Sequence, residues 1–347
     1  MLFATPFSYN FDGEIKSEAK MKHVSILVPV GNTSLSNIEA TYKMFTKVNE
    51  ARQKLGKSPL FKIQLVGLTD EIMLSNSIFS IKPDTTIQEV YQTDLIIIPA
   101  VHGNMNEILL LNSAFKDWIR KQYKLGAEIA SLCLGAFILA STGLLEGKNC
   151  TTHWLSADEF NALFPKVNLV PYKIITDENG IYTSAGGYSS LNLILYLLEK
   201  YAGRDMAIQS SKIFEIDIER DSQLHFIIFQ QQKEHEDATI KRAQEFIENN
   251  FRSRITVDQL ASVLCIGRRN LERRFKKATA NTVLEYIQRV KIEAAKISLE
   301  STNENVNEVM YNVGYSDTKS FRTTFKRITG LSPVQYKNKY SRIHTFN

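Results

Sequence analysis

The stretches VDQLASVLCIGRRNLERRF (residues 257–275) and VNEVMYNVGYSDTKSFRTTF (residues 306–325) follow one plan. Each contains a helix, a tight turn and a second helix, because apolar residues recur at helical spacing on both sides of a short break. In each second helix, two apolar residues stand four apart: Leu271 with Phe275, and Phe321 with Phe325. Residues at that spacing lie on one helix face. The pattern therefore predicts that these pairs pack inward and turn the intervening polar residues outward.

The outward residues of the two second helices are mostly basic or able to form hydrogen bonds. A helix of this width fits the major groove of DNA, where arginine can bind both acceptors of a guanine edge. Residues 238–347 hold 20 Lys and Arg against 10 Asp and Glu, which leaves −5 on residues 1–237 because the whole chain carries +5. Clustered cations favour a polyanion through counterion release. The alternative is a plain helical bundle with a solvated basic surface.

Every segment after residue 237 has helical spacing, and strand patterns are absent there. Breaks at 253–256, 265–267, 279–282, 302–305, 314–316 and 330–333 divide this part into about seven helices. The polar run QQQKEHED at 230–237 is typical of a linker or a solvated helix. We therefore predict a linker at 206–237, an all-helical domain at 238–340 and a tail at 341–347.

The motifs GRRNLERRF (267–275), VGYSD (313–317) and GLSP (330–333) resemble the AraC/XylS family of regulators, over about 238–340. The resemblance implies two helix-turn-helix units, joined by a long helix at about 283–298, that read successive major grooves of double-stranded promoter DNA. It assigns base contacts to Arg269, Glu272, Arg273, Thr318, Lys319, Arg322 and Thr323. It leaves Arg274, Lys276, Lys277, Lys326 and Arg327 mostly to phosphates or solvent. Two residues depart from the family pattern, since Cys265 replaces a frequent turn glycine and Met310 replaces a frequent small residue.

Residues 21 to about 203 alternate short apolar runs with helical patterns, as parallel sheets covered by helices do. The predicted strands are 24–30, 61–68, 95–99, 128–133, 169–176 and 181–184. The predicted helices are 38–55, 107–124, 135–142 and 191–201. We therefore predict an α/β sandwich as the first domain, at residues 22–205.

A thiol stands at a sharp turn in this first domain. The predicted strand at 128–133 runs directly into Leu134, Gly135 and a helix, which places Cys133 at a strand-to-helix elbow. There the helix N-terminus and free backbone N–H groups can lower a cysteine pKa and bind an anionic oxygen. His153 follows in the sequence CTTHW, within reach of the thiol in a folded chain.

Together with GLLEG (143–147) and TSAGG (183–187), the elbow resembles the ThiJ/PfpI (class I glutamine-amidotransferase-like) superfamily, in its branch fused to AraC-type domains. The resemblance covers about 22–205. It implies a flavodoxin-like parallel-sheet sandwich, often dimeric, with Cys133 as the elbow cysteine and His153 as its partner.

The chain departs from the enzymatic members of that superfamily around the thiol. Those members place a carboxylate in the loop after the first strand, where this chain has Ser36. Their Pro-Gly-Gly loop reads PAVHG at 99–103, and the residue after the thiol has no polar side chain. The candidate ligand pocket comprises Cys133, His153, Ser36, His102, Gly103 and Leu134. Cys133 is then a buried inert residue, a sensor of a ligand or oxidant, or a working nucleophile, and His153 is a structural or a catalytic histidine.

Other features narrow the class of protein. No apolar run reaches the roughly 20 residues of a membrane helix. Residues 1–21 lack the pattern of a signal peptide and are interpreted as an extension. Three cysteines at irregular spacing suit neither a disulfide framework nor a zinc site, which fits a reducing cytoplasm. Because no Gly-rich phosphate loop or metal-ligand cluster stands out, we expect no cofactor and no metal.

The leading hypothesis is a cytoplasmic, sequence-specific DNA-binding transcriptional regulator. Its first domain would form a homodimer and bind a small-molecule effector that prefers one arrangement of the DNA-binding domains. One alternative is a cysteine-dependent hydrolase or hydratase for which DNA binding is secondary, and the serine at position 36 argues against it. Another is a scaffold on DNA whose sandwich only dimerises.

Overall fold

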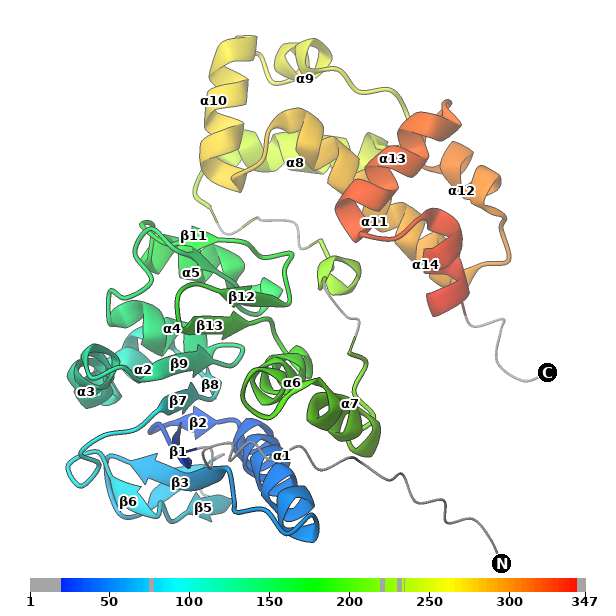
Figure 1. Ribbon diagram of the computed structural model, residues 1–347. Coiled ribbons are helices and arrows are strands. Elements are labelled where there is room, and N and C mark those ends of the chain that lie inside the picture. The colour runs from blue at the N-terminus through cyan, green and yellow to red at the C-terminus, as the bar shows by residue number, and fades with distance from the viewer. Residues whose placement is uncertain (1–19, 75–77, 219–221, 230–232, 234, 342–347) are drawn as a thin grey trace, which may run out of the picture. The chain divides into compact units, whose positions relative to one another are not determined.

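The computed structural model describes residues 20–74, 78–218, 222–229, 233 and 235–341 (Figure 1). These residues form two compact units, the first from 20–169 and 175–218 and the second from 170–174 and 222–341. The predicted N-terminal extension lies almost entirely outside the described residues, as does the predicted tail beyond Ser341. No described helix is both long and apolar enough to cross a bilayer.

The first unit is built on a seven-stranded sheet in the order β12-β13-β9-β7-β1-β3-β6. The strands are β1 (Lys22–Leu27), β3 (Phe61–Gly67), β6 (Thr85–Thr86), β7 (Leu95–Ile98), β9 (Glu128–Ser131), β12 (Ile175–Asp177) and β13 (Ile181–Ser184). All neighbours are parallel except β12, which pairs antiparallel with β13 at the edge. Three two-stranded pairs lie outside it: β2 (Asn32–Thr33) with β8 (Val101–His102), β4 (Ile72–Leu74) with β5 (Phe79–Ile81), and β10 (Asn149–Cys150) with β11 (Asn168–Leu169).

Helices cover both faces of this sheet (Figure 1). Side chains alternate between faces along a strand, so Leu95 and Ile97 of β7 enter one core while Ile96 and Ile98 enter the other. The first core also holds α1 (Leu35–Lys54) and α6 (Ser189–Ala202), with α7 (Arg204–Ile213) beside it. The second holds α2 (Met105–Leu111), α3 (Ser113–Lys124), α4 (Gly135–Ser141) and α5 (Ala157–Leu163), which follows the short η1 (Trp154–Ser156). The predicted parallel-sheet sandwich is confirmed.

Two predicted elements were wrong in detail. The helix expected at 107–124 is two helices, because the buried Asn112 accepts a hydrogen bond from Val30 N–H and donates one to Val30 C=O, both at 2.8 Å. The strand expected at 169–176 is interrupted at 170–174, where the Gln223 side chain and backbone donate to the carbonyls of Pro171 and Tyr172, and Lys173 forms an isolated bridge with Ser222. Neither side-chain partner is visible in local periodicity.

The second unit contains the expected seven helices between residues 238 and 340. They are α8 (Ala238–Asn250), α9 (Val257–Val263), α10 (Arg268–Thr279), α11 (Val283–Ser301), α12 (Val306–Asn312), α13 (Thr318–Thr329) and α14 (Pro333–Tyr340). The core of the first subdomain contains side chains from α8, α9, α10 and the first half of α11. The core of the second subdomain contains side chains from the second half of α11 and from α12, α13 and α14. The long α11 therefore connects two small helical subdomains, and the short η2 (Leu224–Phe226) precedes them.

Polar residues at the breaks explain where these helices begin. Thr282, Asn305 and Ser332 each close a reciprocal capping box with the residue three positions later, at the starts of α11, α12 and α14. Asp237 and Asp317 cap α8 and α13 by accepting backbone N–H groups. Breaks that are visible in the sequence therefore become helix starts.

Candidate functional sites

The thiol at the elbow lies in a strained, tightly built turn. Cys133 has a left-handed backbone, with φ of 54°, and its amide donates to Ser184 Oγ at 3.3 Å. Its carbonyl accepts a hydrogen bond from Thr152 Oγ1 at 2.9 Å. A Cβ on Gly135 would fall 2.3 Å from the carbonyl oxygen of Ile98, so only glycine lets α4 begin this close to β7. The turn therefore depends on neighbours from β13, β7 and the loop after β10 as well as on its own sequence.

The carboxyl ends of β1, β7, β9 and β13 lie at one edge of the sheet, where a cavity of about 380 Å³ opens. Four of the six predicted pocket residues line it: Ser36, His102, Cys133 and His153. The pairing of β2 with β8 places Asn32 opposite His102, which brings the loop before Ser36 to the His102 loop. Gly103 and the Leu134 side chain are not among the lining groups.

The cavity electrostatics favour an uncharged thiol. Burial raises the pKa of Cys133, although hydrogen bonds from the Gly187 and Leu134 amides act in the opposite direction. Burial lowers the pKa of His153, and the nearby His102 lowers it further. Raising the thiol pKa and lowering the imidazole pKa both disfavour a thiolate–imidazolium pair.

The hydrogen bonds of His153 also bear on its chemistry. Its Nδ1 accepts the backbone N–H of Leu155 at 3.1 Å. A neutral imidazole with Nδ1 as acceptor carries its proton on Nε2, so that nitrogen donates and cannot take a proton from a thiol. A Cβ on Gly186 would lie 1.8 Å from His153 Cδ2, so the glycine makes room for the ring. The ring is held in place as a hydrogen-bond donor.

The outer faces of α10 and α13 form the second candidate site. Arg269, Glu272 and Arg273 are exposed on α10, while Leu271 and Phe275 are fully buried. Arg268 Nε donates to Glu272 at 3.2 Å, and Arg273 donates to Asn270 at 3.0 Å. Such exposed pairs contribute little and can be exchanged for contacts with a ligand.

The second face has the same layout. Lys319, Arg322 and Thr323 are exposed on α13 and Thr318 is half-buried, while Phe321 and Phe325 are fully buried. Within the described part of the chain, Lys319 and Arg322 take part in no ion pair. This face therefore presents cations that no neighbouring acid neutralises.

One basic residue of α10 has an acidic partner. Arg274, expected to meet phosphate or solvent, forms a bidentate pair with Asp237 at 2.9 and 2.5 Å. Both side chains are largely shielded from solvent, and the arginine lowers the pKa of the carboxyl. The sequence did not reveal this partner, because it lies 37 positions earlier in a segment interpreted as a linker; a phosphate contact by Arg274 stays a prediction.

A family model described as the DJ-1/PfpI family matches residues 24–200, which is more than half of the chain. The chain belongs to the DJ-1/PfpI family. A second model, described as a helix-turn-helix domain, matches residues 260–339. The AraC-type domain predicted after the DJ-1/PfpI domain is thereby confirmed.

Relatives with assigned names share this organisation or part of it. The chain is 24% identical to the HTH-type transcriptional regulator GbdR of Pseudomonas aeruginosa over 290 residues, which covers 82% of this chain and 76% of that protein. Over 155 residues it is 29% identical to isonitrile hydratase of Pseudomonas putida, covering 44% of this chain and 65% of that enzyme. The chain is therefore similar both to a named regulator and, over a shorter length, to a named enzyme.

A solved structure supports the fold of the DJ-1/PfpI domain. The crystal structure of a putative transcriptional regulator from Vibrio parahaemolyticus covers 56% of this chain and 99% of its own, with 24% identity and a TM-score of 0.50. At that identity the likeness concerns the fold alone.

The sequence did not reveal several residues that line the cavity of the DJ-1/PfpI domain. Asn37 accepts the amide of Ala100 at 3.1 Å and donates to Ser190 Oγ at 3.2 Å, which joins the first turns of α1 and α6 to the loop after β7 behind the cavity. Glu39 also lines the cavity and pairs with Lys43. Asn37 was missed because α1 begins at Leu35, three residues before the predicted start, so Asn37 lies in the first helical turn rather than in the preceding loop.

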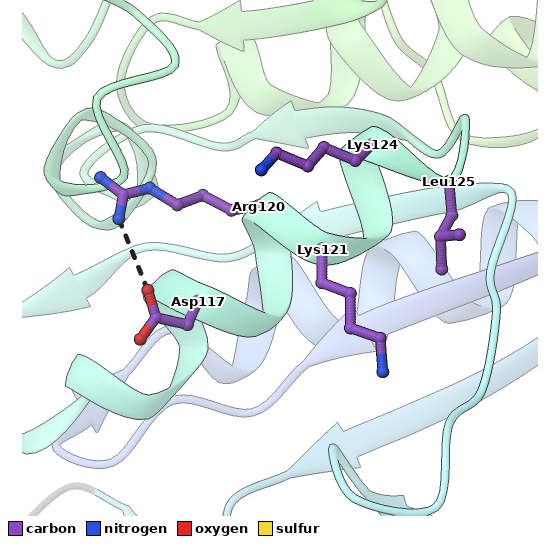
Figure 2. A pocket seen from close by; sticks show the side chains of 5 residues that line it. All are labelled: Asp117, Arg120, Lys121, Lys124 and Leu125. Carbon is purple, nitrogen blue, oxygen red and sulfur yellow. Dashed lines mark hydrogen bonds and ion pairs between the residues drawn. The ribbon is translucent and has the colours of Figure 1, made fainter.

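A second hollow in the DJ-1/PfpI domain lies along α3 (Figure 2). Arg120, Lys121 and Lys124 line it with Asp117 and Leu125, and Figure 2 shows Arg120 reaching Asp117, 3.4 Å away. All five residues come from one helix and its C-terminal cap. With no group from a second element to enclose a ligand, this cluster is a solvated helix face.

Proposed function

We propose that this chain is a sequence-specific DNA-binding transcriptional regulator whose DJ-1/PfpI domain forms a homodimer and binds a small effector. The proposal is supported chiefly by the exposed polar faces of α10 and α13, each held outward by a fully buried apolar pair. The domain organisation shared with a named transcriptional regulator points the same way.

In this proposal the two second helices enter the major groove. Arg269 and Arg273 are suited to guanine edges, Glu272 to the amino group of cytosine, and Arg322 to a guanine in the second half of the site. The threonines of α13 suit either bases or phosphate. A spacing of about one duplex turn, roughly 34 Å, between the two helices stays a prediction.

The effector site is the cavity beside Cys133. Its volume of about 380 Å³ falls in the range of small-molecule pockets. Its walls offer hydroxyls from Ser34 and Ser190 and imidazoles from His102 and His153, with a thiol that burial keeps protonated. These groups can orient a small polar molecule without reacting with it.

A second candidate function is hydration or hydrolysis at Cys133. The elbow geometry and the similarity to isonitrile hydratase favour it. The raised thiol pKa, the serine at position 36 and the Nδ1 hydrogen bond of His153 oppose it. We therefore rank binding above turnover.

DNA selection from a random duplex pool tests the main proposal. The full-length chain should enrich one sequence, and Arg273→Ala should weaken binding and relax one base position by about 1–3 kcal/mol. Arg204→Ala, which removes an exposed arginine from the other unit, is the matched control and should bind as the parent does. If no sequence is enriched, the regulator proposal fails. Turnover of an isonitrile that stops in Cys133→Ser would instead support the enzyme.

A further inference from the structure

The sequence predicted a linker at residues 206–237. The part of this segment around Leu224 and Phe226 packs against the second helical subdomain. Leu224 of η2 packs against the turn after α13, where a Cβ on Gly330 would lie 3.3 Å from Leu224 Cβ. Lys339 of α14 lies over the ring of Phe226, 5.6 Å from its centre. The described residues 222–229, 233 and 235–237 are called the strap below.

The backbone in the middle of the strap bonds to an ion pair on α11 whose lysine is buried. Lys296 is only 4% exposed; its Nζ donates to Ile227 C=O at 2.7 Å and to Glu293 at 2.8 Å. Glu293 accepts the amide of Phe229 at 3.2 Å. A buried charge needs such partners, because leaving one unpaired costs several kcal/mol. Part of what satisfies this pair is strap backbone, so α11 is built to be covered here.

The strap then packs its own aromatic side chain. The ring of Phe229 meets Tyr286 of α11 edge-on, with centroids 5.2 Å apart, and Arg289 lies 5.8 Å from the Phe229 ring. Tyr286 is itself fully buried in the core of the first subdomain. The strap thus crosses from the outside of one subdomain to the core of the other.

The end of the strap is bound to the first subdomain. Asp237 forms the pair with Arg274 of α10 and caps α8. A hydrogen-bond relay begins and ends on the strap: His235 meets Gln244 at 3.0 Å, Gln244 donates to Tyr286, Tyr286 donates to Glu248, and Lys233 donates to Glu248. The strap therefore contacts α10 through Asp237 and the turn after α13 through Leu224.

We propose that the strap is a positioning element for DNA recognition, which holds the two helix-turn-helix subdomains at the spacing and angle that a duplex requires. The two subdomains have separate cores, and α11 joins them. The strap is a second connection, and two connections resist twisting where one helix would bend. Lys296 and Asp237 are its positioning residues, and the inference rests on the proposed DNA-binding function.

The test distinguishes an effect on the spacing of the two helix-turn-helix subdomains from an effect on how each subdomain binds its own half of the DNA site. Full-length variants are measured on the duplex that the parent chain selects, and on two duplexes in which one half is scrambled; Arg322→Ala identifies the half read by α13. Lys296→Met, made together with Glu293→Gln so that no buried carboxylate loses its cation, removes the hydrogen bond from Lys296 to the strap. It should weaken binding to the intact duplex about tenfold and to either half duplex less than about twofold, because the effective concentration of the second unit falls.

A second variant and a matched control keep the test decisive. Asp237→Asn still caps α8 but loses the charge pair with Arg274. It should therefore weaken binding to the intact duplex more than binding to either half duplex, by a smaller factor than the Lys296→Met, Glu293→Gln double variant. Lys291→Met replaces the other buried lysine of α11, which bonds to Gly314 C=O rather than to the strap, and should weaken the half read by α13. If the double variant and Asp237→Asn weaken binding to all three duplexes equally, or do not weaken it, the strap proposal is wrong. Failure of the parent chain to select a duplex would instead overturn the regulator proposal.

Discussion

The turns of the two helix-turn-helix units allow a test of how backbone strain affects local stability. The equivalent turn position is Cys265 in the first unit and Gly314 in the second. Cys265 has φ of 53° and Gly314 has φ of 75°. The left-handed conformation costs a residue with a side chain about 1–2 kcal/mol, whereas glycine adopts it freely. Cys265→Gly removes that strain but adds about 0.5–1 kcal/mol of backbone entropy cost, so we expect a gain of at most about 1.5 kcal/mol.

The reverse exchange should be much more costly. A Cβ on Gly314 would lie 2.1 Å from the carbonyl oxygen of Arg252 and 2.7 Å from Lys291 Nζ. Gly314→Ala therefore adds a backbone clash to the left-handed strain, and overpacking of this kind costs about 1–3 kcal/mol. We expect a local loss of more than about 2 kcal/mol, which corresponds to roughly 30-fold faster amide exchange.

Hydrogen exchange with mass spectrometry on the whole chain measures this locally. Peptides from 306–325 should lose protection in Gly314→Ala, and peptides from 257–275 should keep or gain protection in Cys265→Gly. Gly267→Ala is the matched control, because its Cβ would meet nothing within 4 Å. Unchanged exchange at 306–325 in Gly314→Ala would refute the steric reasoning.

Two other outcomes follow from the titrating groups. In a Cys265→Ser chain, iodoacetamide should alkylate Cys133 more slowly at pH 7.5 than it alkylates a free thiol, because burial raises the thiol pKa above 9.0; reaction at the free-thiol rate would contradict the buried elbow. Arg274 holds the pKa of Asp237 below 3.8, so their pair stabilises the first subdomain above that pH and is lost as pH falls through the folded value. Exchange of α8 amides should therefore rise below about pH 4 in the parent and less in Asp237→Asn.

The helical domain at 238–340 was predictable because the sequence patterns that define its helices are local. Apolar pairs four apart, capping residues at the breaks and a duplicated plan all lie within about 20 residues of each other. The elbow at Cys133 was visible for the same reason, as a strand, a thiol and a helix in immediate succession. Local patterns, with loops supplied by the family resemblance, also predicted one pocket for Ser36, His102 and His153, and all three line the cavity.

What the sequence could not supply was long-range pairing of polar side chains. Asn112 breaks a helix because it bonds to Val30, 82 positions away, and Asn37 of α1 bonds to Ala100 and to Ser190 of α6 behind the cavity. The C-terminal end of the strap is a further case, since its polar composition indicated solvent while Lys233, His235 and Asp237 bond to α8 and α10. A polar residue shows no periodicity that distinguishes water from a buried partner, so only the fold decides.

This distinction has a measurable consequence for DNA binding. Lys277 and Arg274 both lie on α10 and both were expected to meet phosphate or solvent, but only Arg274 is bound to an acid. Each phosphate neutralised by a cation contributes about −0.9 to the slope of log affinity against log salt. Lys277→Gln should therefore make that slope shallower by about 0.9, whereas Arg274→Gln should leave it unchanged while weakening the intact operator through the strap. A salt series from low to physiological ionic strength measures both, and equal changes in slope would mean that Arg274 leaves Asp237 for the duplex when DNA is bound.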